Sequence, residues 1–307
     1  MPSEKIFIVG AGSVGAYFGA RLSRVASVSC LVRSRASADR LSGGVELVGV
    51  ESGHYTPAFL SWGEVDEFPA GSVLLVTTKL TQFQEVSGEI SKRLKHPAST
   101  QIVLCQNGLQ VLEEAQKFLP PEAQLARMLC WFGTRLEPPA RIVVAGGNTV
   151  EVAGGAPDFM EGLERVFRDA GFEYHRRSDV AEIEWKKALW NLAVNAMCGI
   201  AEAPNGAAVE NPHLNALANQ LIDEALVVAG KLGVSLSPDA RAKVFEACAR
   251  TAINYNSTVQ DLRAGRRTEI PWLNGAVVAL GETLGVPVPT HRFVSEMVYF
   301  LEGRVAQ

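Results

Sequence analysis

A glycine-rich segment near the start of the chain constrains its fold more than any other feature. The apolar run from Lys5 to Val9 predicts a short buried strand, and it leads directly into Gly10-Ala-Gly-Ser-Val-Gly15 and then into a helical pattern. Between a strand and a helix, such glycines permit a tight turn, close approach of the backbone to a pyrophosphate, and close helix–strand packing. The segment therefore predicts a dinucleotide-binding domain with phosphates on the helix N-terminus. The predicted contact residues are Gly10, Ala11, Gly12, Ser13, Val14 and Gly15.

The residues after the second predicted strand indicate which dinucleotide is bound. That strand, Val28 to Val32, is followed by Arg33, Ser34 and Arg35, where an NAD-binding domain places an Asp or Glu for the ribose hydroxyls. A guanidinium suits a 2'-phosphate, and no carboxylate is present there to repel it. We therefore predict NADP(H) as the cofactor, with Arg33 as the stronger candidate. The alternative is a solvent-facing pair of arginines without a ligand.

Two later strands place polar residues at their carboxyl ends. The buried-type strand Ser72 to Thr78 is followed by Lys79, and the strand Gln101 to Cys105 is followed by Gln106 and Asn107. Ligands of open parallel sheets bind outside the carboxyl ends of the strands. Two such strand ends beside the glycine-rich loop favour a ligand pocket, although a lysine in such a position is more often a surface residue.

The pattern of predicted elements divides the chain in two. Strands alternate with helices up to about residue 178, with His54 to Leu60 interpreted as part of a strand insertion, and long helical periodicity follows from Asp179. Alternation of this kind favours a doubly wound sheet. We predict an α/β fold in which an N-terminal Rossmann-like dinucleotide-binding domain, 1–178, is followed by an all-α C-terminal substrate and catalytic domain, 179–307.

Composition restricts the partners and the compartment. A net charge of -4 and a pI of about 5.8 provide no basic surface for a nucleic acid. The five scattered cysteines suit reduced core thiols, and no leader or run of ~20 apolar residues precedes or interrupts the pattern, so we expect a cytoplasmic protein without a membrane partner. The five histidines have no metal-ligand spacing, so no metal is expected. The apolar helices are compatible with a monomer or a homodimer.

One helical stretch carries a polar stripe. In Glu184 to Asn195, the side chains of Lys187, Asn191 and Asn195 are four residues apart and lie within roughly 80° of one helix face. An ammonium and two carboxamides suit a small oxygenated molecule better than a metal. The alternative is a solvated helix face that carries polar residues without a ligand.

Taken in order, these motifs resemble those of the ketopantoate reductase (2-dehydropantoate 2-reductase) family. The later segment from Ser257 to Asp261, followed by Arg267-Thr268-Glu269-Ile270, also resembles the signature of that family. The resemblance implies hydride transfer from NADPH to the C2 ketone of a 2-oxo acid. For the named activity the reaction is ketopantoate to pantoate, a step of pantothenate (vitamin B5) and coenzyme A biosynthesis.

The resemblance also implies residue roles. Lys187 would be the general acid, and burial would lower its pKa from ~10.4 while the carboxylate of Glu269, between cofactor and lysine, would keep it charged. The substrate oxygens would be held by Asn191, Asn195 and Asn205, and the substrate carboxylate by Asn254 and Ser257. Lys79 and Asn107 would line the cofactor side of the site.

Two other readings stay open. A 3-hydroxyacid dehydrogenase or imine reductase would use Lys187 and Asn191 but leaves Asn195, Ser257 and Glu269 without roles. A non-catalytic NADP-binding sensor would need the glycine-rich loop but no proton donor. The motifs do not fix the side chain of the 2-oxo acid substrate.

Overall fold

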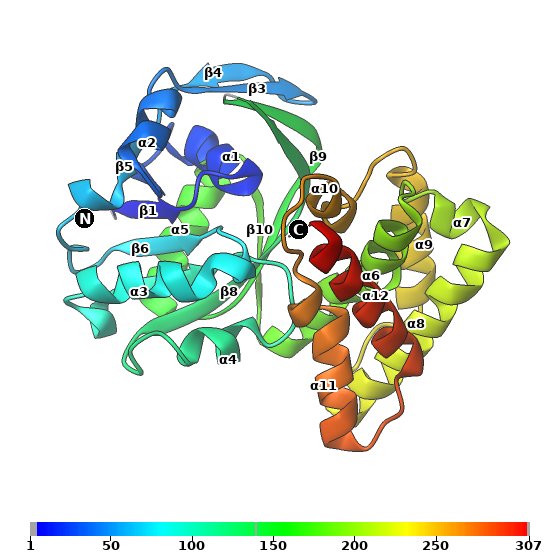
Figure 1. Cartoon of the computed structure of the whole chain (residues 1–307). Helices are drawn as coiled ribbons and strands as arrows, with labels where there is room; N and C mark the ends of the chain where they lie inside the picture. The colour runs from blue at the N-terminus through cyan, green and yellow to red at the C-terminus, as the bar shows by residue number, and fades with distance from the viewer. Residues whose placement is uncertain (1–4, 139, 306–307) are drawn as a thin grey trace. The chain divides into compact units, whose positions relative to one another are not determined.

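The computed structural model describes residues 5–138 and 140–305 (Figure 1). The chain forms two compact units, one comprising Met1–Gln106 and Val111–Val180 and the other comprising Asn107–Gln110 and Ala181–Gln307. The first unit is a mixed α/β structure and the second is helical, which confirms the predicted fold class. The short segment Asn107–Gln110 was predicted within the first domain, but it packs with the helices.

The hydrogen bonds of that segment explain its place. The Leu109 amide donates to the Trp272 carbonyl over 2.8 Å, and the Gln110 amide donates to the Glu184 carboxylate over 2.9 Å. The Leu109 side chain is part of the apolar core of the helical unit. Two hydrogen bonds from backbone amides and one buried leucine therefore join these four residues to helices that are distant in sequence.

The first unit is built on a ten-stranded sheet with the order β4-β3-β9-β8-β7-β6-β1-β2-β5, and β10 pairs with β9. The strands are β1 (Ile6–Val9), β2 (Val28–Val32), β3 (Val45–Gly49), β4 (Gly53–Tyr55), β5 (Ala58–Ser61), β6 (Val73–Val76), β7 (Gln101–Leu104), β8 (Gln124–Glu137), β9 (Arg141–Gly154) and β10 (Glu173–Arg177).

The strands β5-β2-β1-β6-β7-β8 are parallel neighbours. Taken in chain order, they follow the 3-2-1-4-5-6 pattern of a doubly wound nucleotide-binding sheet, with the reversal between β1 and β6. Residues of β5 were predicted as part of an insertion, and this is wrong, because Ala58–Ser61 pairs with β2 as the third strand of the parallel set. The register aligns Val9 with Val76 and Val76 with Leu104, so the carboxyl ends of β1, β6 and β7 lie along one edge.

Helices and 3-10 turns flank this sheet. They are α1 (Ser13–Leu22), α2 (Arg35–Leu41), η1 (Trp62–Glu64), η2 (Leu80–Gln82), α3 (Phe83–Arg93), η3 (Pro97–Ser99), α4 (Val111–Gln116) and α5 (Pro157–Asp169). The antiparallel hairpin β8–β9 is long and irregular near Gly133, and α1 contacts β3, β4, β8 and β9 where the sheet curls over it (Figure 1). Phe18 of α1 packs edge-on against Phe132, Phe167 and Phe172, so an aromatic cluster fixes the helix.

The second unit consists of helices α6 (Val180–Ala201), α7 (Ala207–Glu210), α8 (Pro212–Lys231), α9 (Ala240–Arg250), α10 (Ser257–Arg263), η4 (Ile270–Trp272), α11 (Asn274–Leu284) and α12 (Pro289–Val305). Two breaks interrupt the helical periodicity of this unit. Leu273 has a non-helical conformation (φ -112°, ψ -107°) and separates η4 from α11. After α9, the carbonyls of Ala252 and Asn254 accept the amides of Gly206 and Asn205.

A buried polar network joins four helices of this unit. The Asn274 side chain of α11 donates to the Leu192 carbonyl of α6 (2.9 Å) and lies 3.1 Å from Nδ1 of His291, whose Nε2 donates to the Leu221 carbonyl of α8 (2.9 Å). His291 is in α12 and is fully buried. Burial lowers the pKa of His291 from 6.5 to about 4, and the nearby Glu224 carboxylate opposes this only in part. The imidazole is therefore a neutral structural group at neutral pH.

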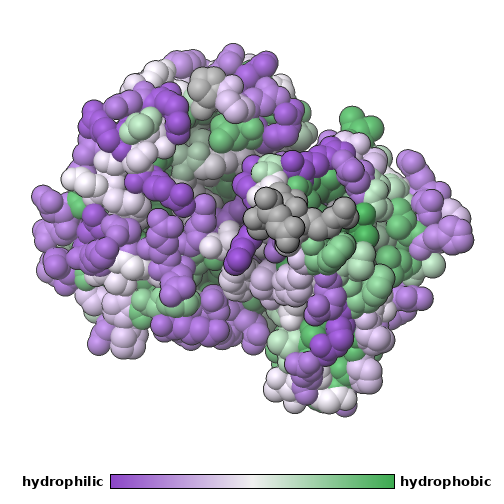
Figure 2. Space-filling model, viewed as in Figure 1, coloured by the Kyte–Doolittle hydropathy of each residue, from purple (hydrophilic) through white to green (hydrophobic). Residues whose placement is uncertain are grey.

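The described residues also show the character of the surface and of possible metal-binding or redox groups. Exposed large apolar side chains are more numerous on the helical unit, where Figure 2 shows broad hydrophobic surface: they are Val209, Val227, Leu232, Ile253, Tyr255, Phe293, Tyr299 and Phe300. Among residues 5–138 and 140–305, no helix is long and apolar enough to cross a bilayer. Within the same ranges, no three His, Cys, Asp or Glu side chains form a group that could hold a metal ion. The five cysteines are free, and burial raises the pKa of the Cys30 thiol to about 12.

The depressed pKa of His291 predicts a specific pH dependence of stability. Between pH 6.5 and 4 the unfolded chain binds a proton at this residue that the folded chain does not, so the contribution is complete above pH 6.5 and is lost as the pH falls toward 4. The loss reaches about 3 kcal/mol. In urea unfolding followed by circular dichroism, the difference between the wild type and His291→Gln is expected to shrink over this range. The exposed His213 of α8 is the control, and His213→Gln should differ from the wild type by a constant amount. A constant difference for His291→Gln would contradict the assignment.

Candidate functional site

The glycine-rich loop is formed by a close approach of backbone groups. Gly10 has φ +102°, and a Cβ on Gly15 would lie 1.9 Å from the Gly10 carbonyl oxygen, so neither position accepts a larger residue without a backbone shift. The Thr77 hydroxyl donates to the same carbonyl over 2.8 Å. By contrast, nothing lies within 4 Å of the position that a Cβ on Gly12 would occupy. Gly12 is also the N-cap of α1 and has no side-chain cap, which leaves the first amides of this helix available to an anion.

The two arginines after β2 differ in their partners. Arg35 is paired with Asp39 (2.8 Å) and with Glu64. The Arg33 guanidinium lies 3.5 Å from the Glu85 carboxylate, and both side chains are about two-thirds exposed. A surface pair at this distance contributes little, so the Arg33 guanidinium is the one with spare donors for a ligand. The role of Arg33 in binding a 2'-phosphate stays a prediction.

The carboxyl ends of β6 and β7 carry buried polar side chains that the sequence analysis did not assign. The Thr78 hydroxyl and both polar atoms of the Gln106 carboxamide are buried and have no hydrogen-bond partner. An unpaired buried polar group costs about 1–3 kcal/mol, so such groups mark sites where a ligand or water completes the bonding. Their position two residues past the end of a parallel strand was the signal available in the sequence. Lys79, the predicted neighbour, is half-buried at the start of η2.

The stripe on α6 has the same character. Asn191 and Asn195 are each 3% exposed, and the Asn195 Nδ2 lies 3.4 Å from the Asn191 Oδ1. This contact uses one donor group and one acceptor, and it leaves the Asn191 Nδ2 and the Asn195 Oδ1 without partners. Lys187 is half-buried one helical turn before Asn191. One face of α6 therefore presents a donor and an acceptor whose hydrogen bonds are unmade, next to an ammonium group.

Asn205, the third asparagine expected to hold the substrate, has a side chain that is hydrogen-bonded to other protein groups. Asn205 is 2% exposed, its Nδ2 donates to the Thr251 hydroxyl (3.2 Å), and its Oδ1 accepts from Asn256 (3.3 Å). Asn256 was missed by the sequence analysis, although an Asn directly before a helix is a typical N-cap. Its own Oδ1 accepts the Val259 amide and so begins α10.

The remaining predicted residues lie in the helical unit. Ser257 is the half-buried first residue of α10, whereas the Asn254 side chain is exposed. Glu269 is 8% exposed and precedes η4. Asn107 was predicted to contact the cofactor, and it is half-buried at the start of the segment that packs with the helices. The contacts of Asn254, Ser257, Glu269 and Asn107 with ligands stay predictions.

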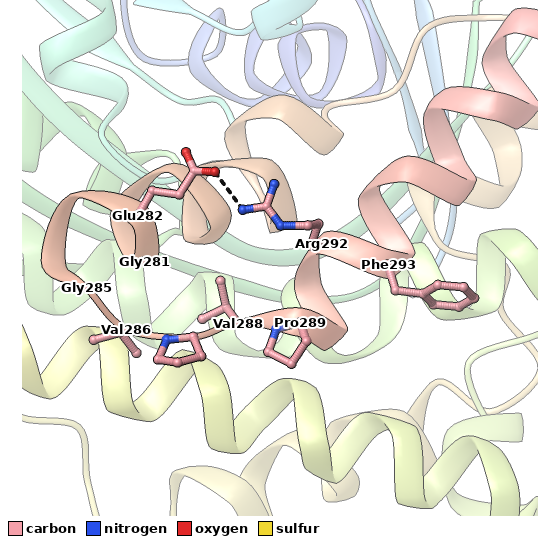
Figure 3. A pocket seen from close by; sticks show the side chains of 9 residues that line it. Gly281, Glu282, Gly285, Val286, Val288, Pro289, Arg292 and Phe293 are labelled. Carbon is pink, nitrogen blue, oxygen red and sulfur yellow. Dashed lines mark hydrogen bonds and ion pairs between the residues drawn. The ribbon is translucent and has the colours of Figure 1, made fainter.

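A surface pocket lies elsewhere in the helical unit. It has a volume of about 560 Å³ and is formed by the connection between α11 and α12, with Val286, Val288 and Phe293 in its wall (Figure 3). Arg292 and Glu282 form an ion pair of 2.6 Å at its rim. It contains none of the predicted site residues and no unpaired buried polar atom.

Two family models match this chain, one in each of its two parts. The family described as Ketopantoate reductase PanE/ApbA matches residues 6–156, and the family described as Ketopantoate reductase PanE/ApbA C terminal matches residues 179–302. A 2-dehydropantoate 2-reductase of Archaeoglobus fulgidus is 28% identical over 306 residues and covers 99% of both chains. Another, from Aquifex aeolicus, is 29% identical over 307 residues and covers 96% of each.

Solved structures with similar folds cover almost the whole chain. A PanE/ApbA family ketopantoate reductase from Ralstonia eutropha JMP134 has a TM-score of 0.89 at 24% identity, over 99% of this chain and 100% of that one. D-mandelate dehydrogenase with NADH and anilino(oxo)acetate also has a TM-score of 0.89, at 21% identity with the same coverage. A dimeric ketopantoate reductase from Staphylococcus aureus has a TM-score of 0.82 at 14% identity, over 98% and 99%. At these identities the structures show the shared fold.

The family matches account for most of the chain, on both sides of the division between the two units. The glycine-rich loop and the polar face of α6 lie inside the matched ranges. This chain is an oxidoreductase that belongs to the ketopantoate reductase family.

Proposed function

We propose that this chain uses NADPH to reduce the C2 ketone of 2-dehydropantoate (ketopantoate) to the alcohol of pantoate, in the biosynthesis of pantothenate. The observation that carries the proposal is the face of α6, where Asn191 and Asn195 present an unpaired buried donor and acceptor beside Lys187. A 2-oxo acid has a carbonyl oxygen that accepts, and ketopantoate has a hydroxyl that both donates and accepts. The full-length relatives named 2-dehydropantoate 2-reductase support this substrate.

The first unit supplies the groups for the cofactor. The uncapped N-terminus of α1 and the open space at Gly12 suit a diphosphate, and Arg33 suits a 2'-phosphate. Lys79, at the end of β6, adds a further cation to this anionic ligand. When bound, the nicotinamide cofactor supplies the hydride.

The second unit supplies the proton and orients the acid. As the hydride adds to C2, the carbonyl oxygen becomes an alkoxide, and the Lys187 ammonium donates a proton to it. The Asn191 Nδ2 donates to a substrate oxygen, and the Asn195 Oδ1 accepts from the substrate hydroxyl. Glu269, a buried carboxylate, offsets the cost of desolvating the ammonium, while Ser257 and Asn254 take the substrate carboxylate and Asn205 supports the Asn256 cap.

The activity itself is tested by following NADPH oxidation with a panel of 2-oxo acids. We expect the highest kcat/KM with ketopantoate, and the panel includes pyruvate and phenylglyoxylate because a structurally similar protein binds anilino(oxo)acetate.

The same assay tests the cofactor preference. Arg33→Ala should weaken the binding of NADPH about 10- to 100-fold and leave the binding of NADH nearly unchanged, since only NADPH carries the 2'-phosphate. Arg35→Ala, which removes an arginine already paired with two carboxylates, is the control. A higher kcat/KM with another 2-oxo acid would make that acid the substrate. Binding of NADPH without turnover of any acid would indicate a sensor.

Lys187 can be tested against its neighbour on the same helix. We expect Lys187→Ala to lower kcat about 10²- to 10⁴-fold, because the alkoxide loses its proton donor. The dissociation constant for NADPH should stay the same, since the lysine is assigned to the substrate side. Lys186 is exposed and one residue away, so Lys186→Ala is the matched control and should retain turnover. Retention of activity by Lys187→Ala would exclude the general-acid role.

The two asparagines should show opposite effects on stability and activity. In Asn191→Leu/Asn195→Leu, two apolar side chains of similar size replace carboxamides with unmade bonds, so we expect unchanged or increased resistance to urea. The same variant should lose kcat/KM for ketopantoate by at least about 10-fold, from the loss of two substrate bonds. Asn205→Leu breaks two existing bonds and should instead lower the unfolding free energy by about 1–3 kcal/mol. Loss of stability in the double variant would indicate a structural role for the pair.

A further inference from the structure

Gln106 is a buried residue whose side chain makes no hydrogen bond within the protein. Its side chain is 5% exposed, and neither the Nε2 nor the Oε1 has a hydrogen-bond partner. Among the buried carboxamides of residues 5–138 and 140–305, it is the one with both polar atoms unpaired. A carboxamide in that state costs free energy and presents one free donor group beside one free acceptor.

The backbone beneath this side chain is held firmly. The guanidinium of Arg127, which is fully buried in β8, donates to the Leu104 carbonyl over 2.7 Å and also to the Gln106 carbonyl. The same guanidinium lies 3.2 Å from the Met128 carbonyl. Arg127 thus fixes the carboxyl end of β7 in position. The unpaired carboxamide is therefore carried on a rigid support, as expected for a group that must be oriented before a ligand arrives.

A second glutamine shows how a structural carboxamide is bonded in this part of the fold. Gln101, the first residue of β7, is fully buried, and its Nε2 donates to the Gln124 carbonyl over 2.7 Å. Its Oε1 accepts the Ala156 amide over 3.1 Å. Protein groups thus satisfy both polar atoms of the buried carboxamide at the start of β7, whereas they satisfy neither at Gln106, two residues past its end.

The position of Gln106 relates it to one half of a dinucleotide. In the order β2-β1-β6-β7, Gln106 follows β7 and Arg33 follows β2, on opposite sides of the glycine-rich loop after β1. Three strand spacings separate β2 from β7, about 14 Å. Dinucleotides bind across the point where the strand order reverses, so a ligand with its 2'-phosphate near Arg33 extends its other half over β6 and β7. That half carries the nicotinamide ring and its own carboxamide.

We propose that the Gln106 carboxamide recognises the carboxamide of the nicotinamide ring, with Nε2 donating to the ring amide oxygen and Oε1 accepting from the ring amide nitrogen. The proposal rests on the nicotinamide cofactor of the proposed function. Two carboxamides are mutually complementary, since each has one acceptor and one donor group. Gln106 is then a positioning residue that sets the orientation of the ring and hence of the hydride.

Binding of two ligands by isothermal titration calorimetry tests this without turnover. The ligands are NADPH and 2'-phospho-ADP-ribose, which lacks only the nicotinamide ring. Gln106→Met keeps the length of the side chain and removes both polar atoms. We expect the dissociation constant for NADPH to rise about 10-fold, from the loss of two hydrogen bonds, and the constant for 2'-phospho-ADP-ribose to stay unchanged.

Gln101→Met is the matched control, with the opposite expectation. It removes two bonds that the protein makes, so its resistance to urea should fall while its affinity for NADPH stays that of the wild type. Gln106→Met should keep or gain resistance to urea, because no protein bond is lost. The two variants therefore separate a ligand-binding glutamine from a structural one.

Each other outcome has a distinct meaning. If the wild type binds neither NADPH nor NADH, the proposed function itself fails. If the wild type binds NADPH and Gln106→Met binds it equally well, the proposed function stands and the role of Gln106 is wrong. Equal weakening of NADPH and 2'-phospho-ADP-ribose would also overturn it, because the effect would then be on the whole binding site and not on the ring.

Discussion

The close approach of Gly15 to the Gly10 carbonyl is the contact on which the first unit depends. A Cβ at Gly15 would lie 1.9 Å from that oxygen, so the start of α1 can reach the end of β1 only because no side chain intervenes. The aromatic cluster around Phe18 then fixes the rest of α1 inside the curl of the sheet. The helix N-terminus is consequently held at the point where the strand order reverses, with its first amides uncapped. The same two glycines therefore allow the packing of α1 against β1 and hold its uncapped N-terminus where the proposed function needs it.

Buried polar side chains in this protein differ in whether other protein groups complete their hydrogen bonds. Asn205, Gln101 and His291 have protein partners that hold helices or strand ends together. Gln106, Asn191 and Asn195 are equally buried, yet they keep unpaired atoms. An unmade bond in the interior is costly, so these positions oppose folding, and the proposed function assigns the missing partners to ligands. The predicted trade between stability and affinity at these residues follows from this cost.

In the helical unit, buried polar side chains connect helices that pack around an apolar core. The network of Asn274 and His291 connects α6, α8, α11 and α12 through two side chains, and it requires a neutral imidazole. Glu224 also accepts the amides of Thr290 and His291 and so holds the start of α12. The long helix α6, which carries the polar face, is thereby anchored through its backbone at Leu192, next to Asn191.

The sequence by itself determined the parts of this protein that depend on local order. The strand, the glycines and the following helix are consecutive, so their geometry follows from covalent connection and φ preferences. The spacing of Lys187, Asn191 and Asn195 is likewise fixed by helical periodicity. The family resemblance, which rested on these motifs, is confirmed by the matches over both parts of the chain.

Only the tertiary structure decided which polar residues have partners. Gln101 begins β7 and Gln106 follows its end, both side chains are buried, and their sequence contexts give no reason to treat them differently. The partners of Gln101 come from residues 124 and 156, which are distant in sequence. The same holds for β5, which joins the parallel sheet, and for Leu109, which joins the helices. Such pairings depend on where separate segments meet in space, and no local pattern encodes them.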